Sequence, residues 1–296
     1  MAENIEERVN GFDSKIMASV HINFLFGAGV NGSAFPHMSG FSETRETLEQ
    51  ILGREMVNFE DDLDSLSSVS KKEKVSKVFI KEFRKFHDNI EFSDASISDL
   101  KEMFGQINRL ILSAENRTIT TKQVNIYTLN YDQIIENVLI GEGFLVNVVS
   151  SSNIESHDKF FELIGYNYNL KKYIPTYLVS KIHGDIDNPI LPGISKYVAS
   201  LEAKRFEILF RMKSQLSRSN SVLIVIGYSG RDNHINTILK DCISSGLTIY
   251  WFRYDIAEII PLEILHNTII FDQPKKDEKQ NMSKLFATKI KAIWEK

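Results

Sequence analysis

Cysteine is almost absent from this chain, and the sequence shows no excess of basic residues. Cys242 is the single cysteine among 296 residues, so an internal disulfide and a zinc site built from paired cysteines are both excluded. The formal net charge of -4 at pH 7 gives no general basic footprint for nucleic acid. We therefore expect no metal site and no direct nucleic-acid binding.

Long apolar runs are also missing. The run VLIVI at residues 222–226 is among the longest, and it falls far short of the roughly 20 residues that cross a bilayer. The first residues, MAENIEER, are acidic and polar, whereas a secretory signal begins basic and continues apolar. Together with the single cysteine, these features predict a soluble cytoplasmic protein that does not associate with membranes.

The chain does contain several short runs of β-branched and aromatic residues, which predict buried strands. These runs lie at residues 21–26, 124–128, 177–182, 222–226, 247–252 and 268–271. Continuous apolar strands that are separated by helical stretches are typical of a parallel sheet covered on both faces. We therefore expect an α/β fold, with a Rossmann-like parallel sheet flanked by helices.

A segment at residues 42–121 interrupts the alternation of strands and helices. Its apolar residues follow three helical stripes, with a polar joint at residues 60–74 after the first. Ser96 and Asp99 form a capping pattern that predicts the start of the third helix. We interpret the chain as one domain that contains an inserted helical subdomain and ends in a helix. The expected boundaries are about 18–41 and 122–275 for the Rossmann-like core, 42–121 for the insertion and 279–295 for the C-terminal helix.

The first motif is LFGAGVNGSAFP at residues 25–36. Gly27, Gly29 and Gly32 follow a predicted strand, where glycines allow backbone amides to approach a pyrophosphate. A glycine turn of any α/β protein is the alternative explanation. The acidic residue that a dinucleotide fingerprint places about twenty residues further on would fall in a predicted helix around Leu48, which disfavours an ordinary NAD dehydrogenase.

The second motif is TLNYD at residues 128–132. Thr128, Asn130 and Asp132 lie between a predicted strand and a predicted helix, at the sheet edge where parallel sheets bind ligands. Either Asn130 or Asp132 alone could cap the helix. Two such residues so close together are harder to explain as caps, which favours a functional role.

Two further segments follow strands, HGD at residues 183–185 and GYSGRD at residues 227–232. His183 is predicted at the same sheet edge, with Asp185 near enough to influence its protonation. Gly227 and Ser229 could offer an amide and a hydroxyl to phosphate or ribose. Asp232 fits a helix N-cap and a ligand contact about equally well. A lone histidine is usually structural, so its functional interpretation depends on the other motifs.

Taken in order, these four segments resemble the motifs of the sirtuin (Sir2) family. The chain departs from the family pattern at Asn31, where serine is usual, and at Tyr228 and Gly230 in the last motif. The zinc-binding cysteine quartet of protein-deacylating sirtuins cannot exist here. The HGD and GYSGRD forms are similar to the divergent Sir2-like proteins of bacterial antiphage defence, which hydrolyse NAD.

The resemblance implies a role for each matched residue. Asn130 would hold the nicotinamide-side ribose and the attacking water, Asp132 the nicotinamide carboxamide, and His183 would be the general base. The other expected contacts to NAD are Gly27, Ala28, Gly29 and Val30 along the pyrophosphate, Gly227 and Ser229 at the phosphates and adenine-side ribose, and Asn31, Phe35, Thr128 and Asp232 elsewhere in the site. Independently of the resemblance, we expect residues 31–42, which include Phe35 and Pro36, to form a mobile lid over the nicotinamide.

The resemblance also implies a function. We expect an NAD+ hydrolase that releases ADP-ribose and nicotinamide without a metal, as the toxic effector of an abortive-infection system. Its control would come from homo-oligomerisation or from a partner protein of the defence system. Two alternatives stay open: an NAD-dependent protein deacylase or ADP-ribosyltransferase, and a catalytically idle nucleotide-binding regulatory subunit.

Overall fold

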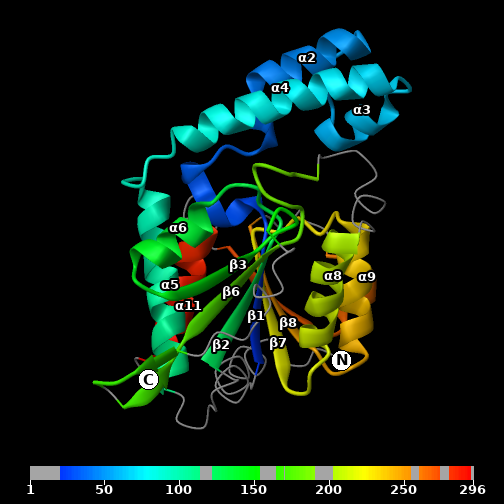
Figure 1. Cartoon of the computed structure of the whole chain (residues 1–296). Helices are drawn as coiled ribbons and strands as arrows, with labels where there is room; N and C mark the ends of the chain where they lie inside the picture. Colours follow the sequence, from blue (N-terminus) through cyan, green and yellow to red (C-terminus); the bar gives the residue numbers. More distant parts are fainter. Residues whose placement is uncertain are drawn as a thin grey trace.

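A seven-stranded parallel sheet forms the centre of the molecule in the computed structural model (Figure 1). The strand order is β3-β6-β2-β1-β7-β8-β9, so β1 lies between β2 and β7. The structure describes residues 21–113, 122–153, 165–169, 171–190, 203–254, 260–273 and 280–294. The strands of the sheet are β1 (His21–Phe26), β2 (Gln123–Thr128), β3 (Leu145–Val149), β6 (Thr176–Lys181), β7 (Ser221–Ile226), β8 (Thr248–Arg253) and β9 (Thr268–Asp272).

The predicted parallel sheet and its flanking helices are confirmed, and each predicted run corresponds to a strand of the sheet. β3 was not predicted, because its sequence LVNVV is interrupted by asparagine and forms a partly exposed strand at the sheet edge. A separate antiparallel pair, β4 (Gly165–Asn167) with β5 (Lys172–Ile174), was not predicted either.

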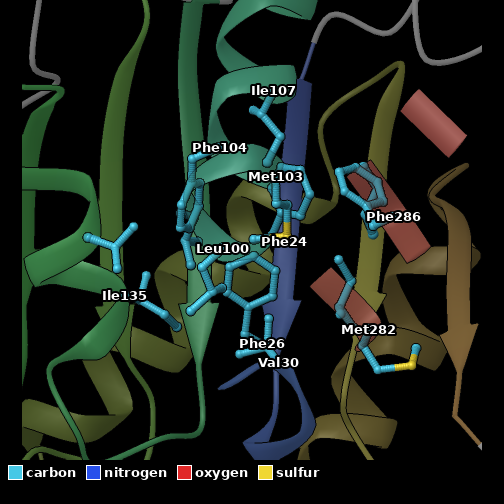
Figure 2. Packing of buried hydrophobic residues seen from close by; sticks show 14 of the residues in the cluster. Phe24, Phe26, Val30, Leu100, Met103, Phe104, Ile107, Ile135, Met282 and Phe286 are labelled. Carbon is cyan, nitrogen blue, oxygen red and sulfur yellow. The ribbon is translucent and has the colours of Figure 1, made fainter. Parts of the chain in front are cut away.

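Helices cover both faces of the sheet because the side chains of each strand alternate between the two faces. Phe24 and Phe26 of β1 pack with α5 (Ala95–Ser113), α6 (Ile134–Gly141) and α11 (Met282–Trp294), as Figure 2 shows for α5 and α11. Leu25 points to the opposite face and packs with α8 (Ala203–Leu216), α9 (Asn233–Ile243) and α10 (Leu262–Leu265). None of the described helices has the length and apolar character of a membrane span.

Three further helices form a unit beyond the end of the sheet (Figure 1). They are α2 (Ser42–Leu52), α3 (Phe59–Ser65) and α4 (Val69–Asp88), and two short 3₁₀ helices, η1 (Ala28–Ala34) and η2 (Met38–Gly40), lead to them. Leu48, Phe59, Leu63, Leu66 and Val75 give this helical unit its own small hydrophobic cluster. The segment 42–121 thus supplies both this unit and α5, which packs on the sheet.

The polar joint predicted at residues 60–74 is wrong, because this segment contains most of α3 and the start of α4. Asn58 caps α3 by accepting hydrogen bonds from the amides of Glu60 and Asp61. The acidic residues that suggested a loop occupy the first turn of α3, where the positive end of the helix dipole favours them.

The capping pattern predicted at Ser96 and Asp99 is also wrong. Asp94 occupies the capping role for α5, since its carboxylate accepts a hydrogen bond from the Ser96 amide at 2.7 Å. The Ser96 hydroxyl instead accepts from the Ser33 amide at 3.0 Å and so joins α5 to η1. At the expected domain boundaries, residues 18–20, 114–121, 274–279 and 295 lie outside the described residues.

Candidate functional site

Four neighbouring strands, β6, β2, β1 and β7, end at one edge of the sheet, because all of them are parallel. Each is followed by one of the four motifs found in the sequence. A cavity of about 720 Å³ opens at this edge, and residues of all four motifs line it. The topology therefore brings together segments that are far apart in the chain.

The glycine loops after β1 and β7 cross each other backbone to backbone. The amides of Gly27 and Gly29 donate to the carbonyl oxygens of Ile226 and Gly227, each at 3.1 Å. A Cβ atom on Gly27 would lie 2.3 Å from the Gly227 oxygen, and one on Gly227 would lie 2.4 Å from the Val30 nitrogen. This close approach requires glycine at both positions. A pyrophosphate could use the amides of Gly27 and Gly29 only if these hydrogen bonds were broken.

Asn130 and Asp132 connect the turn after β2 to the glycine loop. The Asn130 side-chain amide donates to the Gly27 carbonyl at 3.3 Å. The Asp132 carboxylate accepts from Asn31 Nδ2 at 2.9 Å and from the amide of Ile134, the first residue of α6, at 3.0 Å. Nδ2 of Asn31 is thus the side-chain atom that faces the carboxylate, and Oδ1 points away from it. The buried Oδ1 of Asn31 has no hydrogen-bond partner among the described residues.

The side chain of a buried lysine contacts this turn. Lys181, at the end of β6, is 2% exposed, and its Nζ lies 2.6 Å from Glu136 Oε1 and also donates to the main-chain oxygen of Asp132. Burial raises the pKa of Asp132, Glu136 adds to this shift, and Lys181 opposes it. Lys181 thus connects the turn after β2 to the end of β6, two residues before His183.

His183 lies in a tight turn at the end of β6 and is 3% exposed. Its main-chain oxygen accepts from the Ile190 amide at 2.6 Å. The following Gly184 has a φ of 82°, and a Cβ atom there would lie 2.1 Å from the Asn188 oxygen. The turn therefore holds the histidine in one backbone position beside the cavity.

Asp232 supplies a carboxylate that faces His183, a contact that the sequence analysis did not predict. Asp232 Oδ1 lies 3.7 Å from His183 Nε2. The Asp185 carboxylate instead accepts hydrogen bonds from the Ser152 hydroxyl and from the amides of Asp187 and Asn188. Although burial alone raises the pKa of Asp185, its hydrogen bonds hold that pKa below the ordinary value.

The helical unit forms an aromatic wall of the cavity. Phe79 and Phe83 of α4 line it together with Phe35 and Phe41. The Tyr131 ring lies 5.7 Å from the Phe83 ring and 6.3 Å from the Phe79 ring. Since Tyr131 stands between Asn130 and Asp132 in the chain, α4 contacts the turn that carries these two residues.

Two of the predicted site residues do not line the cavity. Val30 is fully buried in the core, and its carbonyl accepts from the Ser283 hydroxyl at 2.8 Å. Thr128 is also fully buried, and its hydroxyl accepts from the Asn130 amide at 3.1 Å. The predicted residues that line the cavity are Gly27, Ala28, Gly29, Asn31, Phe35, Asn130, Asp132, His183, Gly227, Ser229 and Asp232.

Several cavity residues were missed by the sequence analysis. Tyr131 lies inside the TLNYD motif, and Tyr254 directly follows β8. Their positions after predicted strands could therefore have identified both residues. Glu60, Phe83 and Asn281 come from α3, α4 and the residue before α11. Local sequence gives no indication that these three positions reach the sheet edge.

The charges around the cavity are unevenly distributed. Glu60, Asp132 and Asp232 contribute carboxylates, whereas no described lysine or arginine lines the cavity. A second cavity of about 990 Å³ adjoins the first at Glu60 and Ser229, and Arg231 lines it. Within the described part of the chain, no cluster of three or more His, Cys, Asp or Glu side chains is arranged to hold a metal ion.

Comparison with known proteins points to one family. Residues 124–267 match the sequence model of a family described as the SIR2-like domain. This match includes β2, β6 and β7 and therefore three of the four motifs. No curated protein matches the sequence.

Solved structures with a similar fold include Sir2 homologues bound to nucleotides. One is a Sir2 homologue in complex with NAD, with 15% sequence identity, a TM-score of 0.50, and coverage of 97% of this chain and 94% of the other. Another is a mutant Sir2 homologue in complex with ADP-ribose, with 13% identity, a TM-score of 0.53 and coverage of 96% of both chains. At such identities the likeness concerns the fold.

Proposed function

We propose that this chain, which belongs to the Sir2-like family, hydrolyses NAD+ to ADP-ribose and nicotinamide. The observation that carries the proposal is the position of Asn130 and His183, which line one cavity from the ends of the neighbouring strands β2 and β6. A similar fold occurs in a Sir2 homologue whose structure is a complex with NAD.

The cavity offers groups that fit the nicotinamide end of NAD+. Its volume of about 720 Å³ lies within the range of ligand pockets, about 300–1,000 Å³. The nicotinamide carboxamide carries two N–H donors and one acceptor. The Oδ1 of Asn31, which has no partner among the described residues, and the neighbouring Asp132 carboxylate are acceptors for these donors.

The proposed reaction requires the glycosidic bond between the ribose C1′ and the nicotinamide nitrogen to break. The bonding electron pair moves onto the nicotinamide ring and neutralises its positive charge. The oxygen of a water molecule, held by Asn130, forms the new bond to C1′, and His183 takes up the proton that this water loses. The cavity carboxylates favour the positive charge that develops on the ribose.

The pyrophosphate requires a different environment from the ribose. Since carboxylates line the first cavity without a described lysine or arginine, we place the phosphates towards Ser229, where the two cavities meet. There the Ser229 hydroxyl is a donor, and Arg231 supplies a positive charge from the second cavity.

The direct test is to measure nicotinamide release from NAD+ by the purified chain and by the variants Asn130→Ala and His183→Ala. We expect each variant to lose at least about 100-fold in rate, because general-base catalysis and positioning of the nucleophile contribute that much. Asn137→Ala and His266→Ala remove the same side chains at exposed positions and should keep full activity. Near-normal activity of both site variants would contradict the proposed site.

The alternative activities differ in the acceptor molecule that must be present before NAD+ is consumed. A deacylase or ADP-ribosyltransferase would consume NAD+ only when an acylated peptide or another acceptor is present. A regulatory subunit would bind NAD+ without cleaving it, even with its natural partners. Nicotinamide release with water as the only acceptor therefore distinguishes hydrolysis from both.

We further propose that the enzyme acts as a toxic effector in bacterial antiphage defence and is controlled by self-association or by a partner protein. The support is the resemblance of the HGD and GYSGRD motifs to defence proteins, and an unrestrained NAD hydrolase would kill its own cell. We expect phage-infected cells to lose NAD+ when they carry the wild-type chain but not the His183→Ala variant. Full activity of an isolated monomer would contradict the proposed control.

A further inference from the structure

The side chains of Asp232 and His183 face each other at the cavity. Asp232 Oδ1 and His183 Nε2 are 3.7 Å apart, and the two side chains are 9% and 4% exposed. We propose that Asp232 is a positioning residue for His183, which orients the imidazole ring and stabilises the positive charge that the ring acquires with a proton. This inference rests on the proposed role of His183 as the base.

The backbone around Asp232 directs its carboxylate away from the usual capping role. Asp232 occupies the N-cap position of α9, yet its side chain makes no capping hydrogen bond. The main chain is held instead, because the Asp232 amide donates to the Tyr228 hydroxyl at 3.1 Å and the Asp232 carbonyl accepts from the Asn236 amide at 3.0 Å. The carboxylate therefore points to the histidine from a fixed backbone.

Burial strengthens the interaction between these two side chains. At the effective dielectric constant of a protein site, the attraction between two opposite charges is about fourfold stronger than in water.

Other titratable groups surround His183. The His234 ring lies 5.5 Å away, and Asp132 and Glu60 line the same cavity. The Asp185 carboxylate accepts hydrogen bonds from Ser152 and from two amides of its own turn. Asp232 supplies negative charge at ion-pair distance from Nε2.

Removal of the Asp232 carboxylate should shift the pH dependence of activity in one direction. A base must be unprotonated before it takes up a proton from water, so activity falls when acid protonates His183. The Asp232 carboxylate favours the protonated ring, and removing it disfavours that form. The acidic limb of the rate profile should therefore move to lower pH, while the maximal rate falls because the ring becomes a weaker base.

The test is the pH dependence of nicotinamide release by wild type and by Asp232→Asn. We expect the acidic limb to move down by about one pH unit and kcat to fall about 10-fold or more, with less than a threefold change in KM. Asp232→Glu retains the carboxylate and should keep the acidic limb near its wild-type position. Asp272→Asn removes a carboxylate that lines neither cavity, is 50% exposed and is paired with Arg253, and it should leave the profile unchanged.

Two results would overturn the inference. A raised KM with an unchanged acidic limb would make Asp232 a substrate contact. A lower melting temperature with an unchanged limb would make it a structural residue.

A measurement without catalysis separates this inference from the proposed function. NMR titration of the His183 ring in the full chain should give a lower midpoint in Asp232→Asn than in wild type, whether or not NAD+ is cleaved. Equal midpoints would overturn the inference even in an active enzyme.

Discussion

Asp132 is a buried carboxylate whose charge lowers the stability of the fold. Burial raises its pKa, although Lys181 opposes the shift. An acid with a higher pKa in the folded chain than in the unfolded chain lowers stability as pH rises through the unfolded value of about 3.9. We therefore expect Asp132→Asn to increase the free energy of unfolding at pH 7, and this gain should vanish below about pH 4. Urea denaturation at both pH values measures the difference.

For a matched substitution at Asp62, we expect the opposite change in the free energy of unfolding. Hydrogen bonds from the Arg54 side chain and from the amides of Val57 and Asn58 lower the pKa of Asp62. An acid with a lowered pKa stabilises the fold above its unfolded pKa and loses this contribution in acid. Asp62→Asn should therefore decrease the free energy of unfolding at pH 7. A change of the same sign in both variants would contradict this assignment of the two environments.

Single residues also show which contacts could not be predicted from the sequence. The position of His183 at a strand end follows from the buried run before it, but its carboxylate partner does not. Asp185 is close in sequence, yet its carboxylate bonds to amides two and three residues ahead, as aspartates in turns commonly do. Asp232 comes from a different strand end, and only the order of strands in the sheet brings it to the histidine.

Among the elements, the crossing of the two glycine loops leads to a specific prediction. Gly227→Ala places a Cβ atom against the backbone of Val30 at a φ of 68°. The left-handed conformation costs about 1–2 kcal/mol and the overpacking about 1–3 kcal/mol. We expect a loss of several kcal/mol in the free energy of unfolding, measured by thermal and urea denaturation.

Gly143→Ala is the control for the crossing. Gly143 has a φ of 75°, but no described atom lies within 4 Å of the position that a Cβ atom would take there. This substitution should cost only the conformational part, about 1–2 kcal/mol. Equal losses at Gly143 and Gly227 would show that the contact between the loops contributes nothing.

The sequence predicts elements best where burial is complete. β7 is buried at every position, and its apolar run identified it. β3 lies at the sheet edge, and only one of its five residues is buried, so its pattern is weak. α3 carries a run of acidic residues that suggested a loop, whereas Phe59 and Leu63 are the residues that fix it in the helical unit.

At the scale of the whole molecule, the cavity is bounded by both the sheet edge and the helical unit. Phe83 of α4 is 6% exposed and lies against Tyr131. Phe83→Leu removes the aromatic contact, which is worth about 0.5–1.5 kcal/mol. We therefore expect kcat/KM for NAD+ to fall roughly 2- to 10-fold.

Phe92→Leu is the control for this wall, because Phe92 is 46% exposed and does not line the cavity. Its kinetics should match those of wild type. An unchanged kcat/KM in Phe83→Leu would show that α4 does not contribute to the site. The contribution of α4 could not be predicted from sequence, since it depends on how the chain returns to the sheet edge after leaving β1.

The central place of β1 has a consequence for the order in which the protein is made. Asn23 of β1 donates to Ser221 at the start of β7, 198 positions later in the chain. During synthesis on the ribosome, β1 therefore lacks its second neighbour, β7, until most of the polypeptide has been made. The crossing of the glycine loops and the pairing of His183 with Asp232 can form only after that. Nascent chains that end before β7 therefore lack both of these contacts and the cavity that they bound.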